Sequence, residues 1–415
     1  MKKERKSEDL KNFVPEKPNR FLYPLLILAG RILGKIWINA KFKKDARIKE
    51  RKGPFVCVGT HSCIMDVAMM MLTMSPVSLN IVCGRDVMTW NVLKPFAKAI
   101  GLLPINQFEM DLASIRSMKR AVDKGCSLAL FPEGKFTLDG RGLYYIPESL
   151  AKLLKLLKAD VVFCHNNGGY GARPRWYNGF KYGVVTNVSE LLFTKEQLQE
   201  MTDKEIYEIL REKFKFNDCL YQREHNLRYK AKHNNPAEGL HYILYKCPNC
   251  GAEYENVSDA HYLTCEKCGN KVEFTEYGEI IPIGESKYFE RIDLWYEFER
   301  ESVRSEIEDE NFEMRHEVVW EQADENHNYV ELGAGEFFLN HEYIGFKGTR
   351  YDNGEEVLIQ VSTLKQPTIV HKNSEAIDLT IDTIVNRFYF KEVKWSCKYN
   401  IAVEELYRKH KGLPL

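Results

Sequence analysis

Between residues 53 and 190, short apolar runs alternate with segments of helical periodicity. Five of these runs are predicted to be strands because they are short, apolar and followed by polar or turn-forming residues; they are 55–59, 78–83, 102–105, 127–131 and 161–165. Alternation of strands with helices is typical of a parallel sheet that has helices on both faces. We therefore predict an α/β domain built on a mixed, mostly parallel sheet flanked by helices.

Three stretches carry clear helix signals. Residues 111–125 have an amphipathic pattern, with Asp111 as the expected N-cap and Gly125 beyond the last turn. Residues 148–158 follow the same periodicity. Residues 194–215 contain two capping-box patterns, Thr194 with Gln197 and Thr202 with Glu205. These boxes predict two short polar helices that serve as a connector.

The length of 415 residues allows two or three domains, and 44% hydrophobic with 28% charged residues is the composition of a globular chain. The second half predicts a small β-rich domain, since strand-like runs are joined by a turn signal at Asn353 and Gly354 and an amphipathic helix follows from Lys394. We divide the chain into a basic segment (1–52), the α/β domain (53–193), a helical connector (194–245), a cysteine-containing unit (246–275) and the β-rich domain (276–415).

Two C-x2-C pairs lie in the cysteine-containing unit, separated by fourteen residues. Each pair can direct two thiolates toward one point, which predicts a tetrahedral zinc site made of Cys247, Cys250, Cys265 and Cys268. Four thiolates leave no position for a catalytic water, so we expect a structural zinc that folds this segment as a zinc ribbon. An iron–sulfur centre or a redox pair is the alternative.

The N-terminal segment suggests a membrane surface as a partner. Residues 1–52 contain 16 lysines and arginines against 6 acidic residues. Within the apolar stretch 21–37, the longest uncharged run is 21–30, about half of the roughly 20 residues that span a bilayer. We expect a helix that lies in the interface of an anionic membrane. A core helix of the first domain is the alternative.

Location and the class of partner follow from charge and cysteine usage. About twenty mixed-charge residues precede the apolar stretch, so we do not expect a signal peptide. Eleven cysteines then indicate a reducing compartment, and we expect a cytoplasmic protein that is peripheral on the cytosolic face of the membrane. Nucleic acid is the alternative partner for the basic segment and the cysteine-containing unit. In that unit, however, the lysines near the cysteine pairs alternate with glutamates. We therefore expect no nucleic acid partner.

A histidine and an aspartate follow the first predicted strand. In the sequence THSCIMD, His61 comes directly after the strand, and a helix is expected from Ser62 to Pro76. Helical side chains lean toward the N-terminus, so Asp66 can reach back to the ring of His61. A carboxylate on one ring nitrogen leaves the other nitrogen as a base. The alternatives are two unrelated polar residues, or a thiol nucleophile at Cys63, which we instead expect to be a neutral core residue.

A second motif, Phe-Pro-Glu-Gly at residues 131–134, follows another buried strand. In a parallel sheet both motifs lie at the carboxyl edge, where ligands bind in α/β folds. Together they resemble the glycerolipid acyltransferase family of the lysophosphatidic acid acyltransferase type, whose first motif is His-x4-Asp and whose third is Phe-Pro-Glu-Gly. The resemblance covers roughly residues 40–190.

The resemblance implies transfer of an acyl group from a thioester, acyl-CoA or acyl-acyl carrier protein, to the hydroxyl of a lysophospholipid in phospholipid synthesis. No covalent acyl-enzyme is implied. By the same resemblance His61 would be the general base, Asp66 its orienting partner, and Glu133 with Gly134 part of the acceptor site. The acceptor would be of the 1-acylglycerol-3-phosphate type.

The sequence departs from the family pattern where an arginine usually holds the acceptor phosphate. Asn106 and Gln107 stand after the strand at 102–105, and Lys135 and Phe136 replace Thr-Arg after the Phe-Pro-Glu-Gly motif. The phosphate could instead be bound by Lys135, Arg116, Arg120 or Arg141, for which solvated surface charge is the alternative. Arg173 and Arg175, in the glycine-rich stretch 168–176, could close over a headgroup or belong to an ordinary loop.

The C-terminal region resembles a pleckstrin-homology or GRAM-like domain in its pattern of GFKGT, a turn, a strand and a final helix. Such a domain would dock the chain on a membrane or a protein partner. The alternative to an enzyme is a non-catalytic lipid-binding scaffold that recruits partners through its zinc ribbon and C-terminal domain. The presence of His61, Asp66 and Phe-Pro-Glu-Gly favours the enzyme.

Overall fold

The computed structural model describes residues 15–84, 87, 97–105, 112–142, 146–323, 328–364, 369–370, 375–381, 384–391 and 395–413. The chain divides into two compact units, which are considered separately below. The first unit comprises residues 1–173 and 181–221, and the second comprises residues 174–180 and 222–415. Asn106, Gln107, Asp111 and Lys394, which entered the sequence predictions, lie outside the described residues.

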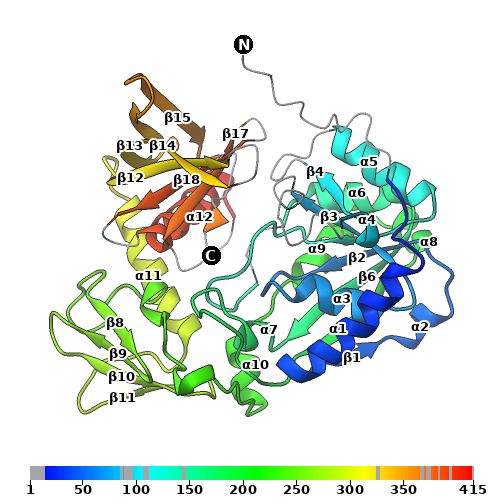
Figure 1. The fold of residues 1–415 in the computed structure, drawn as a ribbon, viewed down its shortest axis with the longest axis horizontal. Coiled ribbons are helices and arrows are strands. Elements are labelled where there is room, and N and C mark those ends of the chain that lie inside the picture. The colour runs from blue at the N-terminus through cyan, green and yellow to red at the C-terminus, as the bar shows by residue number, and fades with distance from the viewer. Residues whose placement is uncertain are drawn as a thin grey trace. The chain divides into compact units, whose positions relative to one another are not determined.

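The first unit is built on a seven-stranded sheet of order β1-β7-β6-β2-β5-β3-β4 (Figure 1). Its strands are β1 Lys41–Lys44, β2 Phe55–Gly59, β3 Leu79–Gly84, β4 Leu103–Ile105, β5 Ser127–Leu130, β6 Asp160–Asn167 and β7 Thr186–Phe193. Neighbouring strands are parallel except for the antiparallel pair of β6 and β7. The predicted mixed, mostly parallel sheet is confirmed.

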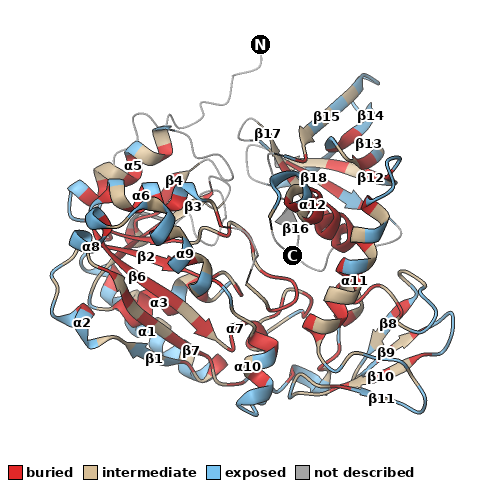
Figure 2. Cartoon of the chain, turned by 180° about the vertical axis from the view of Figure 1, so that it is seen from behind, coloured by how far each residue is buried: buried red, intermediate tan, exposed pale blue. Residues whose placement is uncertain are grey.

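Helices cover both faces of this sheet. The helices of this unit are α1 Leu22–Ile38, α2 Ala46–Lys49, α3 Asp66–Met74, α4 Ala97–Ile100, α5 Leu112–Asp123, α6 Ser149–Leu157, α7 Gly169–Ala172, α8 Lys195–Glu200 and α9 Asp203–Lys213, and α10 Asp218–Glu224 begins in it. Alternate residues of β2 face opposite sides. Val56 and Val58 join a core with α5, α6 and α9, whereas Phe55 and Cys57 join a core with α1 and α3. All of β2 is therefore buried (Figure 2).

The predicted elements of this unit are largely present. Each of the five predicted strands coincides with a strand, from β2 to β6. The helices α5 and α6 occupy the predicted positions, and both capping boxes are formed, at α8 and at α9. The edge strand β1 and the antiparallel strand β7 were not predicted. Among the described helices, none is both long enough and apolar enough to cross a membrane.

The second unit contains two antiparallel sheets. The smaller has the order β11-β10-β9-β8, with β8 Asn256–Asp259, β9 Tyr262–Cys265, β10 Lys271–Phe274 and β11 Ile280–Pro282. The larger has the order β15-β14-β13-β12-β18-β17-β16, with β12 Glu313–Ala323, β13 Tyr329–Asn340, β14 Tyr343–Arg350, β15 Glu356–Ser362, β16 Ile369–Val370, β17 Ala376–Ile381 and β18 Ile384–Phe390. Two 3₁₀ turns, Lys232–Asn234 and Leu240–Tyr242, precede the smaller sheet.

Two long helices complete this unit, α11 Ile292–Ile307 and α12 Ser396–Lys411. The α12 helix is buried on most of its length, and Tyr399 packs with Phe337 and Phe390 of the larger sheet. Buried Arg300 of α11 donates to Glu405 of α12 at 2.7 Å. The predicted β-rich domain with a C-terminal helix is thus confirmed.

Candidate active site and metal centre

His61 lies beyond the carboxyl end of β2, a central strand of the first sheet. Because β2 is parallel to its neighbours β5 and β6, the carboxyl ends of these three strands share one edge. Nδ1 of His61 is 3.3 Å from Oδ2 of Asp66. The side chain of His61 is 15% exposed, and that of Asp66 is 1% exposed. A partly accessible imidazole is therefore paired with a buried carboxylate.

The carboxylate of Asp66 is held in place by three more residues. The backbone N–H of Cys63 donates to Oδ2 at 2.8 Å, and Nδ2 of Asn166 donates to Oδ1 at 2.7 Å. The hydroxyl of Ser62 also donates to Oδ1, at 3.2 Å. A buried carboxylate requires such compensation. Because this carboxylate faces Nδ1 of His61, it favours the tautomer with the ring proton on Nδ1, which leaves Nε2 able to accept a proton.

The helix that contains Asp66 begins later than predicted. We expected it to start at Ser62, but residues 62–65 form turns and α3 begins at Asp66. Residues 63–66 instead form a tight turn, in which the N–H of Asp66 donates to the carbonyl oxygen of Cys63 at 3.1 Å and the Asp66 side chain accepts the N–H of Cys63. The predicted contact between Asp66 and His61 is confirmed, whereas the predicted helix start is wrong.

The Phe-Pro-Glu-Gly turn contacts His61 directly. Oε2 of Glu133 accepts the backbone N–H of His61 at 2.6 Å, and the N–H of Thr137 donates to the carbonyl oxygen of His61 at 3.1 Å. Gly134 adopts a φ of +69°, and its N–H donates to the carbonyl oxygen of Phe131 at 3.1 Å, which closes the turn. The two motifs therefore meet, as their expected positions at one sheet edge required.

Glu133 is buried, being 6% exposed, and one of its oxygens orients the peptide of His61. This contact gives Glu133 a positioning role that the sequence did not suggest. The role of Glu133 and Gly134 in acceptor binding stays a prediction.

The cations predicted for the acceptor phosphate have different surroundings. Lys135 follows Gly134 in the turn beside His61 and is buried. Arg141 bonds the carboxylate of Asp139, and its side chain is 16% exposed. Arg116 lies at an exposed position of α5. Of these three cations, Lys135 is therefore the one that lies next to the motif residues.

Sequence reasoning missed a second polar cluster beside the motif histidine. Nδ1 of His165, in β6, is 2.7 Å from Oγ1 of Thr60, and its Nε2 is 3.7 Å from Oδ1 of Asp218. Asp218 accepts the backbone N–H of Tyr170 at 2.9 Å. The available signal was the polar triplet 165–167 at the end of an apolar strand, which also supplies Asn166 to Asp66.

Cys63 is fully buried. Burial, together with the negative charge of Asp66, raises the pKa of the Cys63 thiol well above its ordinary value. The thiol is therefore neutral near pH 7 and a poor nucleophile. This supports the interpretation of Cys63 as a neutral core residue.

The glycine-rich stretch that follows β6 is divided between the two units. Gly169 begins the short helix α7, and a Cβ atom added there would lie 2.6 Å from Oγ of Ser62. A side chain at this position would displace the residues around Asp66. Arg173 belongs to the first unit and Arg175 to the second.

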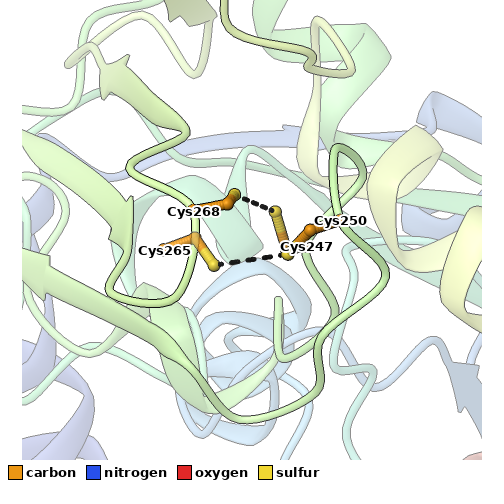
Figure 3. A group of neighbouring side chains, drawn as sticks. All are labelled: Cys247, Cys250, Cys265 and Cys268. Carbon is orange, nitrogen blue, oxygen red and sulfur yellow. Dashed lines mark hydrogen bonds between the residues drawn. The ribbon is translucent and has the colours of Figure 1, made fainter.

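In the second unit, the four cysteines converge on one point (Figure 3). Their sulfur atoms all lie within 4.8 Å of one another. Sγ of Cys247 is 3.7 Å from Sγ of Cys268, and Sγ of Cys250 is 3.8 Å from Sγ of Cys265. Zn–S bonds of about 2.3 Å in a tetrahedron place sulfur atoms about 3.8 Å apart. These two distances therefore match the spacing of a four-thiolate zinc site.

The backbone around the two cysteine pairs is nearly the same. The N–H groups of Gly251 and Gly269 donate to the carbonyl oxygens of Cys247 and Cys265, each at 2.9 Å. Both glycines have positive φ values, +72° and +74°, which other residues rarely adopt. The sequence Cys-x2-Cys-Gly therefore forms a tight turn twice, and each turn presents two thiols to the same point.

Because a thiol must lose its proton to bind a metal ion, metal binding at this site depends on the pKa of each cysteine. Burial raises the pKa of the Cys247 thiol to about 12. A backbone hydrogen bond from Asn270 lowers the pKa of the Cys268 thiol to about 6. A metal ion would have to displace the proton of Cys247 as it binds, so the affinity should increase with pH.

The first unit contains a segment that is similar to known acyltransferases. Residues 39–163 match the family model described as Acyltransferase. A solved structure of the 1-acyl-sn-glycerophosphate (LPA) acyltransferase PlsC from Thermotoga maritima is 15% identical, with a TM-score of 0.39 and coverage of 47% of this chain and 79% of that chain. No curated protein sequence matches the chain. The matched segment includes His61, Asp66 and the Phe-Pro-Glu-Gly turn, and acyl transfer is the activity that this similarity supports.

Proposed function

We propose that this chain is a membrane-associated O-acyltransferase. It moves a fatty acyl group from acyl-CoA or acyl-acyl carrier protein to the free hydroxyl of a lysophospholipid of the 1-acylglycerol-3-phosphate type. One observation carries the proposal: His61, paired with Asp66 and bonded to Glu133 of the second motif, lies at the sheet edge within the segment that matches acyltransferases.

In the proposed reaction, Nε2 of His61 removes the proton of the acceptor hydroxyl as the hydroxyl oxygen attacks the thioester carbonyl carbon. A C–O bond forms and the carbonyl oxygen becomes negatively charged. When this tetrahedral intermediate collapses, the C–S bond breaks and the leaving thiolate takes the proton from the imidazolium. Asp66 stabilises the imidazolium through Nδ1. A positioned base contributes about 10²–10⁴ in rate.

For the acceptor phosphate we propose Lys135 as the first ligand. It belongs to the turn that contacts His61, so a phosphate bound by its ammonium group would be near the reacting hydroxyl. Arg141 and Arg116 are secondary candidates, because Arg141 lies beyond this turn and Arg116 lies on the separate helix α5.

The test of this function is thiol release from acyl-CoA and from acyl-acyl carrier protein, measured with a panel of lysophospholipids that differ in headgroup. We expect release that depends on the acceptor and is fastest with a phosphomonoester headgroup. Analysis of the lipid should show one new ester for each thiol. Absence of release with every pair would favour the non-catalytic lipid-binding scaffold.

We propose that α1 lies in the interface of an anionic membrane on the cytosolic face. Tyr23 and Ile27 of this helix are buried in the first unit. Large apolar side chains on its other sides are exposed by 41–68%; they are Phe21, Leu22, Leu25, Leu28, Ile32, Leu33, Ile36 and Trp37. An apolar patch of this extent is typical of a contact surface, and the basic residues around it suit anionic lipid.

The double substitution Leu28→Glu and Ile32→Glu is expected to reduce binding to vesicles of phosphatidylcholine with anionic phospholipid by tenfold or more. The reason is that two charges would enter the region occupied by acyl chains, at about 1–3 kcal/mol each. Sedimentation with vesicles measures the effect. Leu156→Glu, at an exposed leucine of α6, is the control and should bind as the wild type does. Equal binding by all three proteins would rule out α1 as the docking surface.

In the second unit we propose that the four thiolates bind a structural Zn²⁺, as the sulfur spacing of 3.7–3.8 Å supports. The larger sheet with α12 is proposed to be a pleckstrin-homology or GRAM-like docking domain. Support comes from its strand order, in which the meander β12–β15 is joined to β16–β18 through the pairing of β12 with β18, and from the C-terminal helix that packs on it.

A further inference from the structure

Two aromatic rings pack against the imidazole of His61. Its centroid is 4.6 Å from that of Phe131, at an interplanar angle of 29°. It is 4.0 Å from the centroid of Phe136, at 41°. At such distances both phenyl rings pack directly against the imidazole. Apolar carbon atoms therefore line the surroundings of this ring.

One edge of the imidazole, the one that carries Nδ1, is occupied as well. Nδ1 faces Asp66, and the whole side chain is 15% exposed. With two rings packed against it and Nδ1 next to Asp66, little of the imidazole is open to solvent.

Both rings are fixed by the local backbone. A Cβ atom added to Gly59 would lie 2.8 Å from Cε1 of Phe131 and 2.5 Å from Cε of Met70, so the glycine gives the Phe131 ring its space. Phe136 precedes Thr137, whose N–H donates to the carbonyl oxygen of His61. This bond ties the Phe136 ring to the residue that it covers. The positions of the two rings are therefore fixed by the end of β2 and by the turn after β5.

Water competes with the lipid hydroxyl for the thioester. The same base can activate either nucleophile, and each reaction releases one thiol. Attack by water forms a C–O bond to give a fatty acid, whereas attack by the acceptor gives an ester; in both cases the C–S bond breaks and the thiol takes up the proton. Exclusion of water from a reactive centre suppresses such side reactions.

We propose that Phe131 and Phe136 determine the specificity of this site for a lipid hydroxyl over water, by excluding water from the surroundings of the base. The inference rests on the proposed acyltransferase function and adds two residues to it. These rings do not exchange protons or bonds with the substrate, so they are specificity-determining rather than catalytic residues.

The test compares Phe136→Ala, Phe136→Tyr and the wild type. Acceptor-independent thiol release measures hydrolysis, and acylated lipid measures transfer. In Phe136→Ala the ratio of hydrolysis to transfer should rise about five- to tenfold, because the part of the base against which the ring packs becomes open to water. Phe136→Tyr should restore the wild-type ratio. Phe42→Ala, which removes a partly buried ring of β1 elsewhere in the unit, is the matched control and should leave the ratio unchanged.

A structural role alone would lower hydrolysis and transfer in parallel, and an unchanged ratio in Phe136→Ala would overturn the proposal. If that variant does not fold, Phe131→Leu gives the same comparison. A second readout needs no activity: proton NMR should show the His61 ring protons displaced upfield by the two aromatic rings, and Phe136→Ala should move them downfield. Resonances that stay in place would also contradict the arrangement.

Failure of the proposed function would look different. The wild type would then acylate no lipid in the panel, while the NMR displacement of the His61 ring would persist. Normal acyl transfer with an unchanged ratio in Phe136→Ala would leave the function intact and remove only the role of the rings.

Discussion

His61→Ala is expected to lower acceptor-dependent thiol release by about 10²–10⁴-fold, the contribution of a positioned general base. The fold should persist, because the Glu133 bond to residue 61 uses the backbone N–H and Asp66 keeps its bonds from Cys63 and Asn166. Single-turnover thiol release measures the effect. Thermal unfolding and circular dichroism check that the protein is intact.

Two further variants test the assignment of roles at this site. Asp66→Asn should cause a loss of similar order, since an amide facing Nδ1 favours the wrong tautomer of His61. His410→Ala, at an exposed histidine of α12, is the matched control and should retain wild-type rates. A folded His61→Ala protein with more than a tenth of the wild-type rate would show that another group is the base.

Cys247→Ser and Cys265→Ser are each expected to abolish stoichiometric metal binding and to unfold the segment around the cysteines. Structural zinc contributes about 10–16 kcal/mol of apparent binding free energy to the folding of small zinc domains, and each substitution removes one of the four thiolates. Metal analysis of the purified chain should give one zinc per wild-type chain and less than a tenth of that in the variants. Hydrogen exchange should increase in β8, β9 and β10 and remain unchanged in β2 and β5.

Chelation of the wild-type chain should have the same local effect, and readdition of zinc should reverse it. Cys83→Ser changes a cysteine of the first unit and is the control, which should retain the metal. Metal content that is unchanged in both Cys247→Ser and Cys265→Ser would end the zinc proposal. Iron in place of zinc would favour the iron–sulfur alternative.

The elements that a single sequence could predict are those whose signal is local. The strand at β2 is a fully buried apolar run, and the capping boxes at α8 and α9 are four-residue patterns. The Cys-x2-Cys pairs and the five-residue spacing of His61 and Asp66 are equally local. The expected sheet also placed both motifs at one edge, although the bond between Glu133 and the His61 N–H was not predicted.

What the sequence did not reveal depends on residues that meet only in the fold. β7 alternates buried and partly exposed side chains and includes polar Asn187 and Ser189, so it lacks the apolar run that marks a central strand. Asn166 lies 100 positions from Asp66, and nothing in either local stretch points to the other. The start of α3 was misplaced because residues 63–66 form a tight turn in which Asp66 bonds both backbone groups of Cys63.

The central claim is a direct transfer, promoted by His61, from a thioester to a lipid hydroxyl. It is tested most directly by following an isotopically labelled acyl group from acyl-CoA in a single turnover, with intact-mass analysis of the protein alongside. We predict that the label moves to the lysophospholipid in step with thiol release and that no mass is added to the protein. Label that accumulates on the chain before it reaches the lipid, or equal lipid labelling by His61→Ala, would contradict this mechanism.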